Sequence, residues 1–119
     1  MPKYTLDDLD DLEEAAAHAK PVEQSRALRE VTKVLEQEFI SYAVIGGMDF
    51  YLRGSGRTTS DVHIAVNDSP RMDALLGLFD PDPNIFLPAT KMQWLAGVAR
   101  IFVKVDGRTV QIDLLTTGS

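Results

Sequence analysis

The segment YAVIGGMDFYLRGSGRTTSDVHIAV, from Tyr42 to Val66, carries the pattern from which the fold is predicted. It opens with an apolar run that ends at the paired glycines Gly46 and Gly47. A short amphipathic segment follows, and a second alternating run begins at Asp61. Short apolar runs bounded by glycine are typical of strands. The pattern therefore predicts a strand, a glycine turn, a short helix and a second strand.

The two glycines predict a phosphate-binding turn. Glycine lets the backbone adopt positive φ and approach another group closely. The start of the helix expected after Gly46 and Gly47 would also present unpaired N–H groups to an anion.

The second strand of this stretch has two chemically different faces. Side chains alternate along a strand, so Val62, Ile64 and Val66 share one face. Asp61 and His63 share the other face. Two potential metal ligands therefore point the same way.

A hairpin is predicted near the end of the chain. Asp106-Gly107 is a strong two-residue turn signal between the runs 100–105 and 108–115. This register puts Asp113 on the face opposite the apolar one, as for Asp61 in the earlier strand. Asp113 is then either a third carboxylate of a site or the cross-strand partner of Arg100.

The remaining periodicity predicts helices that begin near Thr5 and Pro21 and a third over 70–79. We expect an α/β (α+β) fold with a mixed, twisted sheet of about four to five strands and helices packed on one face. The expected strands are 42–46, 62–66, 100–105 and 108–115. The chain, 1–119, is expected to be one domain, with an N-terminal helix in 1–20 and a core in 21–115.

Composition narrows the possible functions. The net charge is −6 and the pI about 4.7, which argues against a broad nucleic-acid-binding surface. A local basic cleft from Arg53, Arg57, Lys91 and Arg100 remains compatible with this charge. The chain has no cysteine, which excludes disulfides and thiolate metal sites. No stretch is apolar enough to span a membrane, and the acidic N-terminus is unlike a signal peptide, so we expect a cytoplasmic protein.

The central motif resembles the nucleotidyltransferase superfamily related to DNA polymerase β. The family signature is a hydrophobic residue, Gly, Gly or Ser, a spacer, and Asp-hydrophobic-Asp/Glu-hydrophobic, with a third carboxylate on a later strand. Ile45-Gly46-Gly47 matches its first part, and positions 48–60 form the spacer. Asp61-Val62-His63-Ile64 matches all but one position. The resemblance covers roughly 41–115 and is closest to the AbiEii-like and minimal branches.

The resemblance implies an activity and a site. The activity would be transfer of NMP from an NTP to a hydroxyl of a protein, an RNA or a small molecule, with Mg²⁺ or Mn²⁺ as the cofactor. The implied catalytic and metal-binding residues are Asp61, His63 and Asp113. The implied nucleotide-binding residues are Gly46, Gly47, Arg57 and Ser60.

His63 is the departure from the family pattern. A neutral imidazole carries no charge and cannot bridge two metal ions as a carboxylate does, and a nitrogen ligand moves the preference from Mg²⁺ towards Mn²⁺ or Zn²⁺. Three hypotheses for the function follow. The chain is an active transferase with altered metal preference, a degenerate relative that binds a nucleotide or a protein, or an interaction module alone. We also expect a homo-oligomer or a protein partner, because the first helix offers only three leucines and larger family members extend beyond this core.

Overall fold

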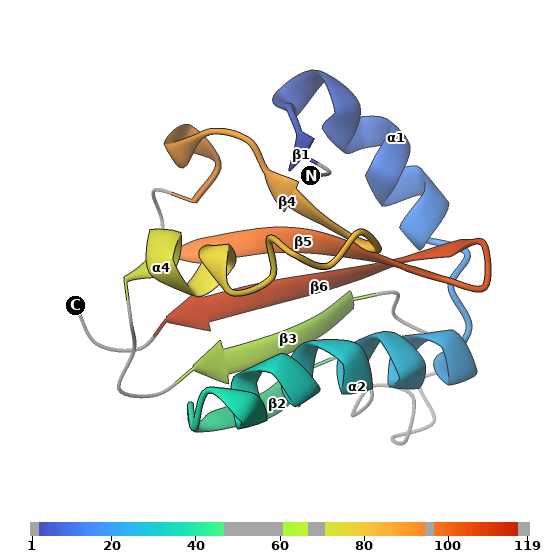
Figure 1. Ribbon diagram of the computed structural model, residues 1–119. Helices are drawn as coiled ribbons and strands as arrows, with labels where there is room; N and C mark the ends of the chain where they lie inside the picture. Colours follow the sequence, from blue (N-terminus) through green and yellow to red (C-terminus); the bar gives the residue numbers. More distant parts are fainter. Residues whose placement is uncertain (1–2, 47–60, 67–70, 95–96, 117–119) are drawn as a thin grey trace.

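A six-stranded mixed sheet forms the body of the chain in the computed structural model, which describes residues 3–46, 61–66, 71–94 and 97–116 (Figure 1). The strand order is β1-β4-β5-β6-β3-β2. The bounds are β1 Lys3–Tyr4, β2 Tyr42–Gly46, β3 Asp61–Val66, β4 Ile85–Pro88, β5 Val98–Val105 and β6 Arg108–Thr116. The predicted α+β class with a mixed sheet is confirmed, with six strands in place of four or five.

The predicted hairpin joins β5 and β6 in the expected register. Arg100 is the partner of Asp113, and Ile101 is the partner of Ile112. Asp106 and Gly107 have φ values of 50° and 79°. Positive φ at both central residues is the type I′ geometry, whose twist matches that of the flanking strands.

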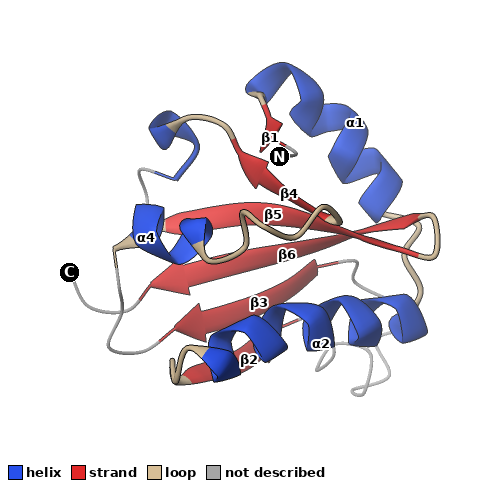
Figure 2. Cartoon of the chain, viewed as in Figure 1, coloured by secondary structure: helices blue, strands red, loops and turns tan. Residues whose placement is uncertain are grey.

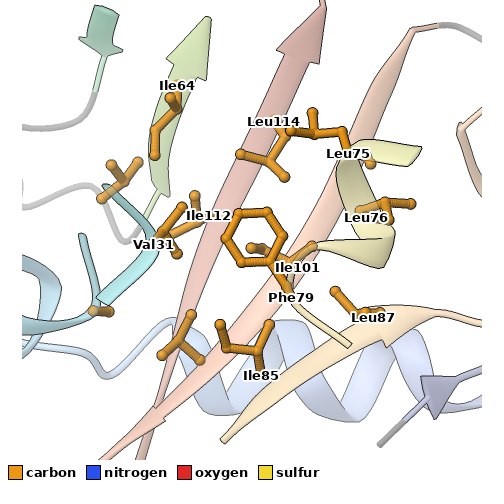
Figure 3. Packing of buried hydrophobic residues seen from close by; sticks show 14 of the residues in the cluster. Val31, Ile64, Leu75, Leu76, Phe79, Ile85, Leu87, Ile101, Ile112 and Leu114 are labelled. Carbon is orange, nitrogen blue, oxygen red and sulfur yellow. The ribbon is translucent and has the colours of Figure 1, made fainter. Parts of the chain in front are cut away.

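One face of the sheet carries the main core (Figure 3). Helices α2 (Pro21–Gln37) and α4 (Met72–Gly77) pack on it. They occupy the predicted places, although α4 is shorter than the expected 70–79. The buried side chains come from both helices, from every strand except β1 and β2, and from the segment that follows α4, which contributes Phe79. Among the others are Val31, Leu35, Leu75, Ile85, Ile64, Ile101, Ile112 and Leu114. Trp94, in the 3₁₀ helix η1 (Lys91–Trp94), packs against this core and is partly buried.

The other face is covered by α1 (Leu6–Ala16), so helices lie on both sides of the sheet (Figure 2). Its N-terminus has the capping box of Thr5 and Asp8 that the sequence indicates. Leu9 and Leu12 pack against a small second cluster of Tyr4, Ala16, Phe86 and Phe102. The Tyr4 and Phe102 rings meet edge to face, with centroids 5.3 Å apart. The first helix thus packs two of its three leucines, partly buried, within its own chain, whereas Leu6 is 62% exposed.

No helix among the residues described is long and apolar enough to cross a bilayer.

The turn at Gly107 allows a matched test of backbone conformation. A Cβ added at Gly107 would meet no atom within 4 Å, so Gly107→Ala should act only through the positive φ. We expect it to lower the free energy of unfolding by about 1 kcal/mol. Gly77 also has room for a Cβ but lies in α4 without positive φ. Gly77→Ala should leave stability unchanged or raise it by about 0.5 kcal/mol. Urea unfolding of both variants measures this, and equal losses would contradict it.

Candidate functional site

Three neighbouring strands bring a row of polar side chains onto the α1 face of the sheet. In the parallel pair of β3 and β6, His63 is the Cα partner of Asp113. In the antiparallel pair of β5 and β6, Arg100 is the partner of the same Asp113. Directly paired residues lie on the same face, so His63, Asp113 and Arg100 form one row with the carboxylate in the middle.

Asp113 is held by a two-point ion pair. Its Oδ1 accepts a hydrogen bond from Arg100 Nε at 2.9 Å, and its Oδ2 accepts one from Nη2 at 3.2 Å. Only 2% of Asp113 is exposed. The planar guanidinium fork matches the carboxylate geometry and makes this the stronger kind of charged hydrogen bond. Both oxygens of the carboxylate are therefore already engaged.

Arg100 also binds a second carboxylate, from the helix that covers this face. Its Nη1 donates to Oε2 of Glu13 in α1. The hydrogen bond to Asp113 is the main cause that raises the pKa of Arg100, against the lowering effect of its partial burial. Arg100 therefore stays protonated throughout the pH range in which the protein can be handled.

The N-terminal strand holds Arg100 from its backbone. The hydroxyl of Tyr4, in β1, donates a hydrogen bond to the Arg100 carbonyl oxygen. Burial raises the pKa of the Tyr4 phenol, so the hydroxyl remains a donor. The segment 3–16 thus contacts Arg100 at both its backbone and its guanidinium.

His63 lies beside Asp113, on the side opposite Arg100. Its Nε2 is 3.8 Å from Asp113 Oδ2, which is beyond hydrogen-bonding distance. The His63 side chain is 36% exposed, whereas that of Asp113 is 3% exposed. His63 and Arg100, whose side chain is also 36% exposed, are therefore the accessible members of the row.

The remaining predicted site residues are placed only in part. Asp61 is the first residue of β3 and the Cα partner of Gln111, two positions before the His63 row. Gly46 is the last residue of β2. The predicted nucleotide-binding residues Gly47, Arg57 and Ser60 lie outside the described residues. The proposed basic cleft includes Arg53 and Arg57, also outside them, and Arg100, which is committed to Glu13 and Asp113.

The arrangement around Asp113 does not fit a Mg²⁺ ion. Mg²⁺ requires free oxygen ligands in near-octahedral geometry. Asp113 offers two oxygens that already accept from Arg100, and His63 offers nitrogen. Within 3–46, 61–66, 71–94 and 97–116, no group of three His, Asp or Glu residues is arranged to hold a metal ion. The cross-strand pairing that the sequence left open for Asp113 is present, and its role as a ligand stays a prediction.

Two contributors to this site were missed by sequence reasoning. The hairpin register predicted Arg100 opposite Asp113, but nothing local to Glu13 or Tyr4 connected them to β5. Glu13 lies 87 positions from Arg100 and Tyr4 lies 96 from it. Only the packing of α1 on the sheet brings them together.

Comparison with known proteins gives one structural similarity. No protein-family model matches the sequence, and no curated protein matches it. Among solved structures, the chain is similar to a proposed nucleotidyltransferase from Thermotoga maritima, with 17% sequence identity and a TM-score of 0.47. The similarity covers 83% of this chain and 59% of the other, so this chain spans less than two thirds of that protein's length.

The two carboxylates around Arg100 should differ sharply in their effect on stability. Asp113→Asn leaves Arg100 without its buried counter-charge. We expect a loss of about 2–3 kcal/mol, below the usual cost of breaking a fully buried pair because Arg100 is 36% exposed. Glu13→Gln, at a carboxylate 33% exposed, should cost less than about 1 kcal/mol. Urea unfolding of the two isosteric variants compares them, and a larger loss for Glu13→Gln would contradict this assignment.

Proposed function

We propose that this chain is a nucleotidyltransferase-fold domain, related to the AbiEii-like and minimal branches, that binds a nucleotide without transferring it. The observation that carries this proposal is the two-point ion pair between Arg100 and Asp113. The sequence motif from Ile45 to Ile64 supports the family, and the ion pair supports binding without transfer because it occupies the carboxylate that the family signature would assign to metal.

The chemistry explains why the ion pair matters. Nucleotidyl transfer depends on metal ions about 3.5–4 Å apart that bind the triphosphate, activate the acceptor hydroxyl and stabilise the leaving pyrophosphate. The resemblance assigns their ligands to Asp61, His63 and Asp113. His63 brings no negative charge when neutral, and the charge of Asp113 is compensated by Arg100. These two positions therefore supply no free carboxylate. Of the three implied ligands, only Asp61 would remain to bind two divalent ions.

Nucleotide binding does not need the same ligands. A glycine turn and a helix start bind phosphate through backbone N–H groups, whatever the state of the carboxylates. We assign this role to Gly46 and Gly47, with Arg57 and Ser60 as further phosphate contacts, on the strength of the sequence motif. A cytoplasmic location, and a protein partner or a second copy of the chain, belong to the same proposal.

A second candidate is an active transferase that prefers Mn²⁺ to Mg²⁺. The parallel register of β3 and β6 favours it, because His63 and Asp113 lie side by side as paired metal ligands would. Imidazole nitrogen suits Mn²⁺ better than Mg²⁺. In this reading NMP passes from an NTP to a hydroxyl of a protein, an RNA or a small molecule, and Arg100 must leave Asp113 first.

Binding and transfer should be measured separately on the wild-type protein. Calorimetric titration with ATP and GTP should show binding, and a pyrophosphate-release assay with Mg²⁺ or Mn²⁺ should show none. Gly47→Val should abolish binding because its side chain fills the space that the phosphate needs, whereas Gly77→Ala, remote in α4, should bind as wild type does. Pyrophosphate release with Mn²⁺ would establish the transferase in place of our proposal. If the wild-type protein binds neither ATP nor GTP, our proposal is rejected, and the interpretation of the chain as an interaction module remains.

A further inference from the structure

Arg100 lies among groups that would otherwise attract a metal ion. Asp113 reaches it from β6 and Glu13 from α1, and His63 lies on the far side of Asp113. Carboxylate and imidazole are ligand types that bind Mn²⁺, although these three side chains are not arranged as a metal site while Arg100 lies between the carboxylates. In this structure the positive charge at their centre is a guanidinium.

We propose that Arg100 acts as a resident cation that excludes divalent metal ions from Asp113, and that Glu13 of α1 holds it in that position. This inference rests on the proposed function, because it explains how the family site is closed to metal. It identifies Arg100 as the residue that sets cation specificity at this position.

The geometry supports exclusion rather than simple charge balance. Arg100 donates a hydrogen bond to each oxygen of the Asp113 carboxylate, so a second cation would have to share either oxygen with the guanidinium. On the His63 side, a metal ion would meet Oδ2 of Asp113, which lies 3.8 Å from His63 Nε2. That oxygen already accepts from Nη2 at 3.2 Å, so an ion bound to its second lone pair would lie close to the guanidinium. It would also be repelled by the charge on Arg100.

Glu13 makes displacement harder. A guanidinium expelled from Asp113 needs another counter-charge, and Glu13 already binds its Nη1 from the covering helix. Tyr4 fixes the Arg100 carbonyl from β1, so the backbone cannot easily move away with the side chain. Cation exclusion is therefore coupled to the packing of residues 3–16 on this face (Figure 1).

The inference also predicts the result of restoring the family residue. His63→Asp adds the missing carboxylate but leaves Arg100 on Asp113. The His63→Asp variant should therefore bind Mn²⁺ or Mg²⁺ at most about threefold more tightly than wild type does. The gain is small because a charge added at a solvent-exposed position contributes little energy. His63→Asp combined with Arg100→Met should bind both ions at least tenfold more tightly than wild type, because a second change then frees Asp113 and Glu13.

The direct test is the effect of Mn²⁺ and Mg²⁺ on thermal unfolding of wild type, Arg100→Met and Arg100→Lys. Arg100→Met removes the charge and keeps most of the aliphatic stem. Arg100→Lys keeps a charge, and so protects folding, but a single ammonium cannot form the two-point fork. We expect a rise in the unfolding midpoint of about 5–10 °C for Arg100→Met at roughly a hundred times the dissociation constant for Mn²⁺. The rise should be smaller for Arg100→Lys and less than about 1 °C for wild type.

Two controls locate the effect. Asp113→Asn combined with Arg100→Met removes both charges and should no longer respond to Mn²⁺. Lys104→Met removes a cation on the same face of β5, where Lys104 lies 5.8 Å from the centre of the Phe86 ring, and should behave as wild type does. If Arg100→Met is unfolded without metal, Mn²⁺ should restore its circular dichroism spectrum.

The unfolding measurements test the role of Arg100 without any nucleotide. The proposal is overturned if neither Arg100 variant responds to Mn²⁺, or if wild type binds Mn²⁺ as tightly as Arg100→Met. The unfolding assay contains no nucleotide, so failure to bind ATP or GTP would reject the proposed function while leaving this result readable. A wild-type protein that binds nucleotide while Arg100→Met ignores metal would reject only the role given to Arg100.

Discussion

The buried carboxylate of Asp113, on the face of the sheet that α1 covers, restricts how the strands and this helix can be arranged. Desolvation of an ionised carboxylate costs several kcal/mol unless a partner compensates it. Arg100 is that partner, and it can reach Asp113 only in one register of β5 against β6. A slip by one residue would turn Arg100 towards the apolar core and an apolar side chain towards the polar row. The ion pair and the type I′ turn therefore specify the same register.

The same constraint explains why α1 lies where it does. The second face is mixed, with Arg100 and Asp113 beside the apolar rings of Phe102 and Phe86. An isolated helix of eleven residues is marginal in water, so α1 depends on tertiary packing. Leu9 and Leu12 cover the rings, and Glu13, one residue on from Leu12, reaches the guanidinium. A helix with few apolar residues can thus cover a face that is only partly apolar.

The parts of the fold that the sequence predicts are those encoded locally. Asp106-Gly107 predicts the β5–β6 register because two residues determine the turn, and the alternation from Val62 to Val66 predicts the polarity of β3. The apolar stripe of Ala27, Leu28, Val31, Val34 and Leu35 predicts the inner side of α2, on which Ala27, Val31 and Leu35 are fully buried and the other two partly buried. β1 was not predicted because two residues, Lys3–Tyr4, are too few to show a period. The face covered by α1 could not be predicted either, since three leucines fit against either side of a sheet.

The site shows a different limit of sequence reasoning. The local pattern correctly directed Asp113 towards the polar face, but the same orientation serves a metal ligand and an ion-pair partner equally well. What favours one over the other is a contact from Glu13, distant in sequence, that commits Arg100 to this row. Nothing in the alternation of β6 contains that information.

A guanidinium and a divalent metal ion are not equivalent in such a site. Both neutralise carboxylates, but a guanidinium brings one charge and donates hydrogen bonds in a fixed plane, and it has no coordination position to offer a phosphate oxygen. It therefore holds Asp113 and Glu13 together without supplying Lewis-acid chemistry. The backbone register that pairs His63 with Asp113 is set by the strands and does not depend on which cation lies beside the carboxylate. Through Glu13, the same guanidinium also ties the N-terminal segment to the sheet.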